Sequence, residues 1–137
     1  MKAYAVLDTN VLVSALISSN PSAATVQVFT RMLAGEVTPV YSEAVLQEYE
    51  EVLSRQKFGI NETVISGLME AIRTFGIAVN PTASGVTLPD MEDVPFYEVV
   101  LEVRDEGAYL VTGNKKHFPK EAFIVTAREF IEILDQL

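Results

Sequence analysis

The sequence predicts an α/β fold built on a central, mostly parallel sheet, because short β-rich runs alternate with longer stretches of helical periodicity. Four runs are expected to form strands, at residues 2–8, 37–42, 108–114 and 122–127. Helical patterns separate or follow them, at residues 23–35, 42–55, 61–76, 94–107 and 127–137. The length of 137 residues, 49% of them apolar, fits a single domain over residues 1–137.

Capping residues mark where the predicted helices begin and end. Gly35 closes the first long helical pattern, and Ser42 and Asn61 stand where N-terminal capping side chains are expected for the next two. Pro95 fits the first turn of the fourth pattern, since a first turn does not need its N–H group. Asp93 therefore lies at the N-terminus of that helix.

Composition excludes several classes of site. The chain has no cysteine, so disulfides, thiolate metal sites and a cysteine nucleophile are excluded, and a reducing cytoplasm is the expected setting. Ten Lys and Arg against nineteen Asp and Glu give a net charge of -9. This balance argues against binding nucleic acid through a broad basic surface, so any such contact is expected to be local.

The first residues have the outline of a secretory signal, but Asp8 and Asn10 interrupt the apolar run. No later stretch approaches the roughly 18 consecutive apolar residues that a membrane span requires. A soluble intracellular protein without membrane contact is expected.

Polar residues follow two of the predicted strands. Asp8 and Asn10 end the first, and Thr112 and Asn114 end the third. Ligands of parallel sheets bind beyond the carboxyl ends of the strands. If these two strands are neighbours, Asp8 and Asn114 share one edge of the sheet.

The helical pattern at residues 42–55 places two glutamates beside its apolar face, which consists of Val45, Leu46, Tyr49, Val52 and Leu53. Glu48 and Glu50 each fall about 100° from the centre of that face. Spacing alone does not choose between them.

Each acid also has a purely structural interpretation. Asp8 fits a helix N-cap as well as a metal ligand, Glu48 fits a solvated helix edge, and Asp93 fits an N-cap. Their combination favours function, because several carboxylates share a site only if a cation offsets their repulsion. Carboxylate and amide oxygens suit Mg²⁺ or Mn²⁺ better than zinc, and such ions support phosphodiester hydrolysis by activating water and stabilising charge on the phosphoryl group.

Other phosphate chemistries fit less well. The sequence contains neither a Walker-type GK[ST] nor a GxGxxG after the first strand. Its DTN motif, residues 8–10, departs from the DxD of aspartyl-phosphate phosphatases, because Asn10 cannot act as their acid.

The turn after residue 114 carries local positive charge and the single histidine. Lys115, Lys116 and Lys120 could receive a phosphate backbone, and a solvated lysine turn is the equally weighted alternative. His117 is expected to be a surface loop residue. The Pro- and acid-rich segment at residues 80–95 is long enough to suggest a functional loop.

Four segments in this order resemble the PIN-domain proteins, metal-dependent ribonucleases that include many toxins of toxin–antitoxin pairs. The segments are VLDTNVLVSAL, YSEAVLQEYEEVL, DMEDVPFYEVVLE and AYLVTGNKKHFP. The resemblance implies a three-layer α/β/α sandwich and a pocket of acids that holds Mg²⁺ or Mn²⁺ for RNA hydrolysis. Its Ser-x5-Glu-Tyr pattern selects Glu48 over Glu50, and it assigns the first and third acids to Asp8 and Asp93.

The sequence departs from the family pattern at the fourth acidic position. The matching residue is Asn114, which offers a neutral oxygen where many relatives have aspartate, so the number of metal ions stays open. Gly107 and Ala108 replace a common Ala-Asp pair and are interpreted as variation in packing. Asp90 could support the site from the loop, although an exposed loop acid is the preferred interpretation.

The resulting hypothesis is a Mg²⁺- or Mn²⁺-dependent endoribonuclease. Asp8, Glu48 and Asp93 are expected to bind the metal, and Asn114 to complete or orient its shell. Asn10 and Thr112 are expected to assist by hydrogen bonding, and the three lysines to contact RNA.

By resemblance, a small antitoxin partner is expected, and homodimers are common in the family, although the sequence identifies no exposed apolar interface for one. The alternative function is a PIN-like scaffold without catalysis that binds protein or RNA. It is suggested by Asn114 and by the acidic charge.

Overall fold

A five-stranded sheet forms the centre of the computed structural model, which describes residues 3–137. The strands are β1 (Ala3–Leu7), β2 (Val37–Tyr41), β3 (Ile77–Ala78), β4 (Tyr109–Val111) and β5 (Ile124–Val125). All paired strands run parallel, in the order β3-β2-β1-β4-β5. The four predicted strands are confirmed, with Lys2 of the first outside the described residues, and β3 is an addition too short to leave a pattern.

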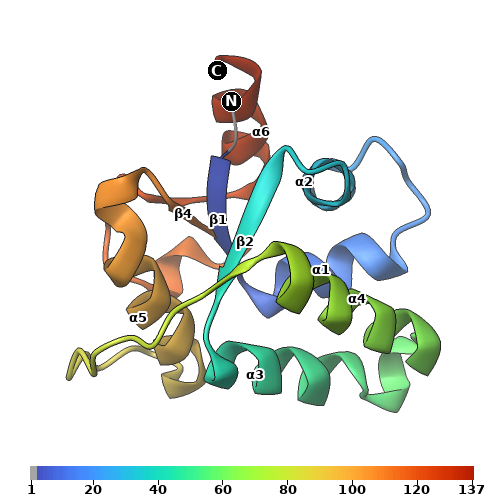
Figure 1. The fold of residues 1–137 in the computed structure, drawn as a ribbon, viewed down its shortest axis with the longest axis horizontal. Helices are drawn as coiled ribbons and strands as arrows, with labels where there is room; N and C mark the ends of the chain where they lie inside the picture. Colours follow the sequence, from blue (N-terminus) through green and yellow to red (C-terminus); the bar gives the residue numbers. More distant parts are fainter. Residues whose placement is uncertain (1–2) are drawn as a thin grey trace.

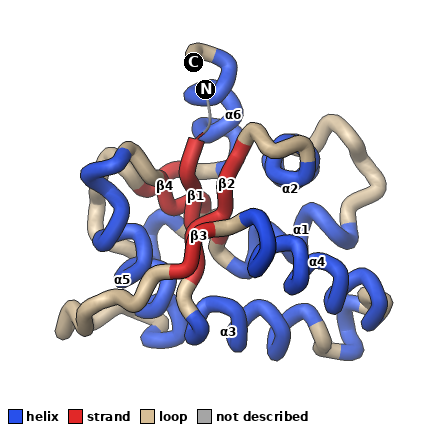
Figure 2. The backbone as a smooth tube through the Cα atoms, in the orientation of Figure 1, coloured by secondary structure: helices blue, strands red, loops and turns tan. Residues whose placement is uncertain are grey.

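Helices cover both faces of this sheet. They are α1 (Thr9–Ile17), α2 (Ala24–Leu33), α3 (Glu43–Leu53), α4 (Glu62–Phe75), α5 (Val94–Val103) and α6 (Ala127–Asp135). Helix α5 packs across β1, β2 and β4, whereas α2 and α6 pack together and contact β2 and β4. Figures 1 and 2 show α5 on one side of the strands and α2 on the other. The predicted three-layer α/β/α sandwich is confirmed.

The predicted capping residues form the expected contacts. Ser42 Oγ accepts a hydrogen bond of 3.3 Å from the Val45 amide, and Asn61 Oδ1 accepts one of 2.7 Å from the Thr63 amide. Gly35 follows α2 with a φ of 83°, the left-handed conformation that glycine adopts readily. These local signals fix where α2, α3 and α4 end or begin.

Helix α5 is shorter than its sequence pattern suggested. The expected span of residues 94–107 divides into α5 and a separate 3-10 turn, Arg104–Glu106, before Gly107 with a φ of 83°. Phe96, Val99 and Val100, which share one face of α5, are buried against the sheet. This packing fixes the orientation of the helix start, where Asp93 lies.

The chain reverses its direction of travel across the sheet between β1 and β4. From β1 it adds β2 and β3 on one side, and it then returns to add β4 and β5 on the other. Such a switch point leaves a crevice at the carboxyl ends of the two central strands, where α/β proteins bind ligands. The Asp8 amide donates to the Val111 carbonyl at 2.9 Å, so the polar residues after β1 and β4 are neighbours.

The segment between β3 and α5 extends beyond this edge of the sheet (Figure 2). It ends in a 3-10 turn, Met91–Asp93, that leads directly into α5.

Among residues 3–137, none of the helices has both the length and the apolar character needed to cross a membrane.

Candidate active site

Asp8 lies at the N-cap position of α1, but its side chain does not cap the helix. Instead Asp8 Oδ2 accepts a 2.6 Å hydrogen bond from Thr112 Oγ1 and a longer one, 3.4 Å, from Asn10 Nδ2. The residue is only 5% exposed. The Asp8 side chain therefore makes no N-cap hydrogen bond, and its carboxylate is directed towards the end of β4.

Thr112 and Asn10 connect the two strand ends around Asp8. Thr112 is fully buried, and its Oγ1 also accepts a 3.0 Å hydrogen bond from the Asn114 amide. Asn10 Oδ1 accepts one of 3.1 Å from the Gly113 amide. Both residues expected to assist by hydrogen bonding thus contact Asp8, and Asn114 follows in the same turn.

Asp93 also occupies an N-cap position, that of α5, but its side chain accepts no capping hydrogen bond from a backbone amide. Its Oδ2 lies 3.3 Å from His117 Nδ1. The Asp93 side chain is 14% exposed and that of His117 is 33% exposed. The sequence predicted a surface loop residue at His117; the one signal for a role in the site was that this histidine follows the polar end of β4 by only a few residues.

Glu48 and Glu50, which helical spacing left as alternatives, have different surroundings. Glu48 is half-buried and lies within the electrostatic influence of Asp90 and Glu92. Glu50 is exposed and lines a hollow beside α4. Of the two glutamates, Glu48 is therefore the one with a raised pKa, to which the nearby Glu92 and Asp90 contribute.

Tyr49 of α3 contacts both β1, which precedes Asp8, and α5. Its hydroxyl donates to the Leu7 carbonyl, one residue before Asp8, and its ring packs on Phe96 with centroids 5.9 Å apart. Burial raises the pKa of the Tyr49 hydroxyl far above its ordinary value, so it remains a donor. One buried side chain thus joins α3, β1 and α5 behind the three acids.

The carboxyl groups of Asp8, Glu48 and Asp93 share a raised pKa. Burial is the largest cause in each, and nearby acids add to it: Asp93 for Asp8, Asp90 for Asp93 and Glu92 for Glu48. The pKa of Asp8 rises to about 6. Within residues 3–137 none of the three forms an ion pair with Lys or Arg, and the basic group in contact with Asp93 is the His117 imidazole.

This set of donors fits a hard divalent cation, because its members are carboxylate and amide oxygens. Thr9 Oγ1, beside Asp8, is buried and has no hydrogen-bond partner in the described part of the chain. The carboxylates do not converge on one point: over residues 3–137, no three His, Asp or Glu side chains are close enough together to hold an ion. Repulsion between uncompensated carboxylates favours such a spread arrangement.

The three lysines differ in their contacts. Lys115 Nζ forms an ion pair with Glu129 Oε1 at 3.0 Å. Lys116 and Lys120 are exposed, and all three line one hollow of about 470 Å³ in the turn after β4. Lys116 and Lys120 are therefore better placed than Lys115 to receive an external phosphate.

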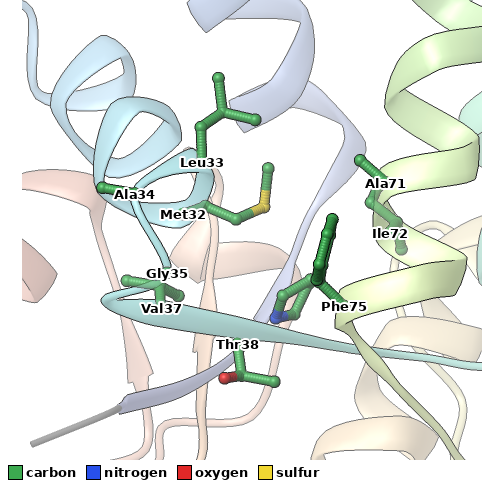
Figure 3. A pocket seen from close by; sticks show the side chains of 10 residues that line it. Met32, Leu33, Ala34, Gly35, Val37, Thr38, Ala71, Ile72 and Phe75 are labelled. Carbon is green, nitrogen blue, oxygen red and sulfur yellow. The ribbon is translucent and has the colours of Figure 1, made fainter.

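An apolar pocket of about 270 Å³ lies at the opposite edge of the sheet and contains none of these acids. Figure 3 shows Met32 and Leu33 of α2 on one side of it and Phe75 of α4 on the other. Its floor includes Val37 and Thr38, the first residues of β2, whereas the acids lie at the carboxyl ends of the strands. None of its lining side chains is titratable, so this pocket supplies neither acid–base groups nor charged metal ligands.

Residues 4–116 match the family model described as PIN domain, so the chain belongs to the PIN domain family. The match includes Asp8, Glu48, Asp93 and Asn114 and ends one residue before His117. PIN domains are generally nucleases and typically use divalent metals such as Mg²⁺. No significant match to a curated protein or to a solved structure was found.

Proposed function

We propose that this protein is a Mg²⁺- or Mn²⁺-dependent endoribonuclease that hydrolyses RNA phosphodiester bonds. The observation that carries the proposal is the state of Asp8 and Asp93. Both occupy helix N-cap positions, neither caps its helix, and both keep a raised pKa among other acids without a Lys or Arg ion pair in the described residues. Burying carboxylates in this way costs free energy that a structural role would not require.

The ion would be held by Asp8, Glu48 and Asp93, with Asn114 completing or orienting its shell. When bound, it would supply an activated water and stabilise negative charge on the phosphoryl group. Thr112 and Asn10 hold the Asp8 carboxylate in place through their hydrogen bonds.

His117 acts on the third acid of the site. Its Nδ1 lies 3.3 Å from Asp93 Oδ2, and a proton on Nδ1 directed at this oxygen fixes the orientation of the carboxylate. Lys116 and Lys120 would attract the RNA backbone from the turn beyond β4.

The direct test is cleavage of a mixed-sequence RNA by the wild type and by Asp93→Asn, with Mg²⁺ or Mn²⁺ and with a chelator. We expect cleavage that the chelator abolishes and that Asp93→Asn reduces by more than about 100-fold, because an ion ligand matters more than its supporting groups. Asp105→Asn, an exposed acid in the turn after α5, is the matched control and should retain activity. Equal cleavage by Asp93→Asn and the control would refute the proposal.

The finer proposal is that this nuclease is the toxin of a toxin–antitoxin pair acting in the cytoplasm, where its RNA substrate lies. PIN domains are often toxins, which supports it. Expression of the wild type alone should arrest growth, and expression of Asp93→Asn should not. Relief of the arrest by a small protein encoded next to this gene would identify the antitoxin.

The second candidate is a PIN-like scaffold that binds protein or RNA without cleaving it. Asn114, in place of a fourth acid, and the net charge of -9 favour it. Calorimetric titration of Mn²⁺ separates the two functions: the nuclease requires binding that Asp8→Asn and Asp93→Asn weaken, with RNA added where phosphate oxygens complete the shell.

A further inference from the structure

A second pocket opens at the switch point, beside the candidate active site. Its volume is about 270 Å³, and it lies between α1, the turn after β4 and the first turns of α2 and α6. Its polar side chains are all neutral amides and hydroxyls: Asn10, Ser14, Thr25, Thr112, Asn114 and Thr126. We call this the hydroxyl pocket.

The hydroxyl pocket is one side chain away from the buried carboxylate. Two of its lining residues donate hydrogen bonds to Asp8 Oδ2: Thr112 through Oγ1 at 2.6 Å and Asn10 through Nδ2 at 3.4 Å. A group bound in the pocket would therefore lie beside any group held at Asp8. The two places form adjacent parts of one crevice.

Much of the hydrogen-bonding capacity of the pocket is unused. Ser14 Oγ and Thr25 Oγ1 share one hydrogen bond of 2.9 Å, which leaves one hydroxyl hydrogen and several lone pairs free. Thr126 Oγ1 accepts from the Glu129 amide at 3.1 Å and keeps its own hydrogen. The Asn114 side chain has no hydrogen-bond partner within residues 3–137, so its Nδ2 donors are available to the pocket even when Oδ1 belongs to the shell of the ion.

These properties define the ligand by its chemistry. The absence of charged side chains among the lining residues disfavours a phosphate, a free cation or an acidic peptide. Neutral donors and acceptors in a pocket of this size suit an uncharged polar ring system, and Val11 and Ala127 add small apolar surfaces against which its face can pack. In RNA, the part with this chemistry is the nucleoside, whose base edges and 2′-hydroxyl offer both donors and acceptors.

We infer that the hydroxyl pocket is a nucleoside subsite, which binds the base and ribose of the nucleotide next to the scissile phosphate. The inference rests on the proposed ribonuclease function and adds a substrate contact to it. It also explains how so acidic a chain engages RNA: neutral contacts hold the nucleoside while the charged phosphate lies towards the acids and their cation.

The test blocks the pocket without changing the acids. Thr25→Leu fills it from the first turn of α2, and Thr30→Leu makes the same substitution at an exposed position on the same helix. Thr25→Val removes the hydroxyl without adding volume and serves if the leucine variant is poorly folded. The probes are adenosine, guanosine, cytidine and uridine, followed by NMR titration, together with kcat/KM for RNA and calorimetry of Mn²⁺.

We expect at least one nucleoside to bind, and Thr25→Leu to weaken it and lower kcat/KM about tenfold or more, mainly through KM. Thr30→Leu should match the wild type, and Mn²⁺ affinity should be equal in all variants. The inference is overturned if Thr25→Leu and Thr30→Leu agree in both nucleoside affinity and kcat/KM. Failure of the proposed function gives a different result. The wild type then neither cleaves RNA nor binds Mn²⁺, whether or not it binds a nucleoside.

Discussion

Asp8 is a buried carboxylate whose ionised form costs stability. Its carboxylate is buried, shares its neighbourhood with Asp93 and makes hydrogen bonds with Thr112 and Asn10 in place of a helix cap. Burial raises its pKa from 3.8 to about 6, against the lowering effect of the Thr112 hydrogen bond. Ionisation of Asp8 therefore opposes folding when no cation is bound.

The stability of the metal-free protein should depend on pH through this group. Because the folded pKa lies above the unfolded one, the stabilising contribution is complete below pH 4 and is lost as pH rises through 6. At about 1.4 kcal/mol per pKa unit, the loss is about 3 kcal/mol. Asp8→Asn carries no charge, so it should exceed the wild type in unfolding free energy by up to this amount at pH 8 and match it at pH 4.

Urea denaturation in a chelating buffer at the two pH values measures this difference. Asp105→Asn, at an exposed position, should give no comparable gain at pH 8. Wild-type stability equal to or above that of Asp8→Asn at pH 8 would contradict the interpretation that ionisation of Asp8 opposes folding.

At the scale of elements, the segment before α5 is fastened to that helix by two glutamates. Glu98 Oε2 accepts a 2.6 Å hydrogen bond from the Ser84 amide, and Glu102 Oε1 accepts one of 2.8 Å from the Thr82 amide. Further along, Asp90 Oδ1 accepts from the Glu92 amide at 2.9 Å. The helix that begins beside Asp93 thus also positions the loop that leads to it.

Removing one fastening should loosen the loop without affecting the helix. Glu98→Ala deletes the acceptor of the Ser84 amide, so hydrogen exchange at residues 82–86 should accelerate about tenfold, equivalent to losing about 1.4 kcal/mol of protection. Glu98→Gln keeps an acceptor oxygen, so its exchange rate at residues 82–86 should lie between those of Glu98→Ala and the wild type. Exchange in α5 should stay unchanged, and unaltered exchange at Ser84 would show that the loop is held by other contacts.

For the whole molecule, a net charge of -9 limits where a polyanion can bind. Lys115 is engaged by Glu129, whose pKa is lowered first by the Thr126 amide and then by this lysine. Lys116 and Lys120 are exposed beside it. Local positive charge is therefore available from two lysines of the turn rather than from three.

RNA binding should reflect this difference between the lysines. With Asp93→Asn as the non-cleaving background, Lys116→Gln and Lys120→Gln should each weaken RNA binding and reduce the salt-dependence slope by about 0.7, the value for one phosphate contact in a single strand. Lys115→Gln should have a smaller effect. Fluorescence anisotropy across a salt series measures both quantities, and equal slopes for all three variants would refute the distinction.

Local patterns in the sequence predicted the elements and much of the site. Capping by Ser42 and Asn61, the left-handed Gly35 and the apolar face of α3 all depend on residues within one or two helical turns of each other. Strand β3 was missed because its two exposed residues carry no such pattern. The family motifs pointed to the three acids because each motif is a short run of neighbouring residues that can be recognised in the sequence.

The fold class, the family resemblance and the candidate acids all follow from the amino-acid sequence without the structure. The contacts of these residues depend on the tertiary structure. Asp8 accepts a hydrogen bond from Thr112 instead of capping α1, His117 lies against Asp93, and Lys115 forms an ion pair with Glu129. Periodicity records only neighbours within a few residues. Asp8 and Thr112 are 104 positions apart, and their contact exists because β1 and β4 pair at the switch point of the sheet.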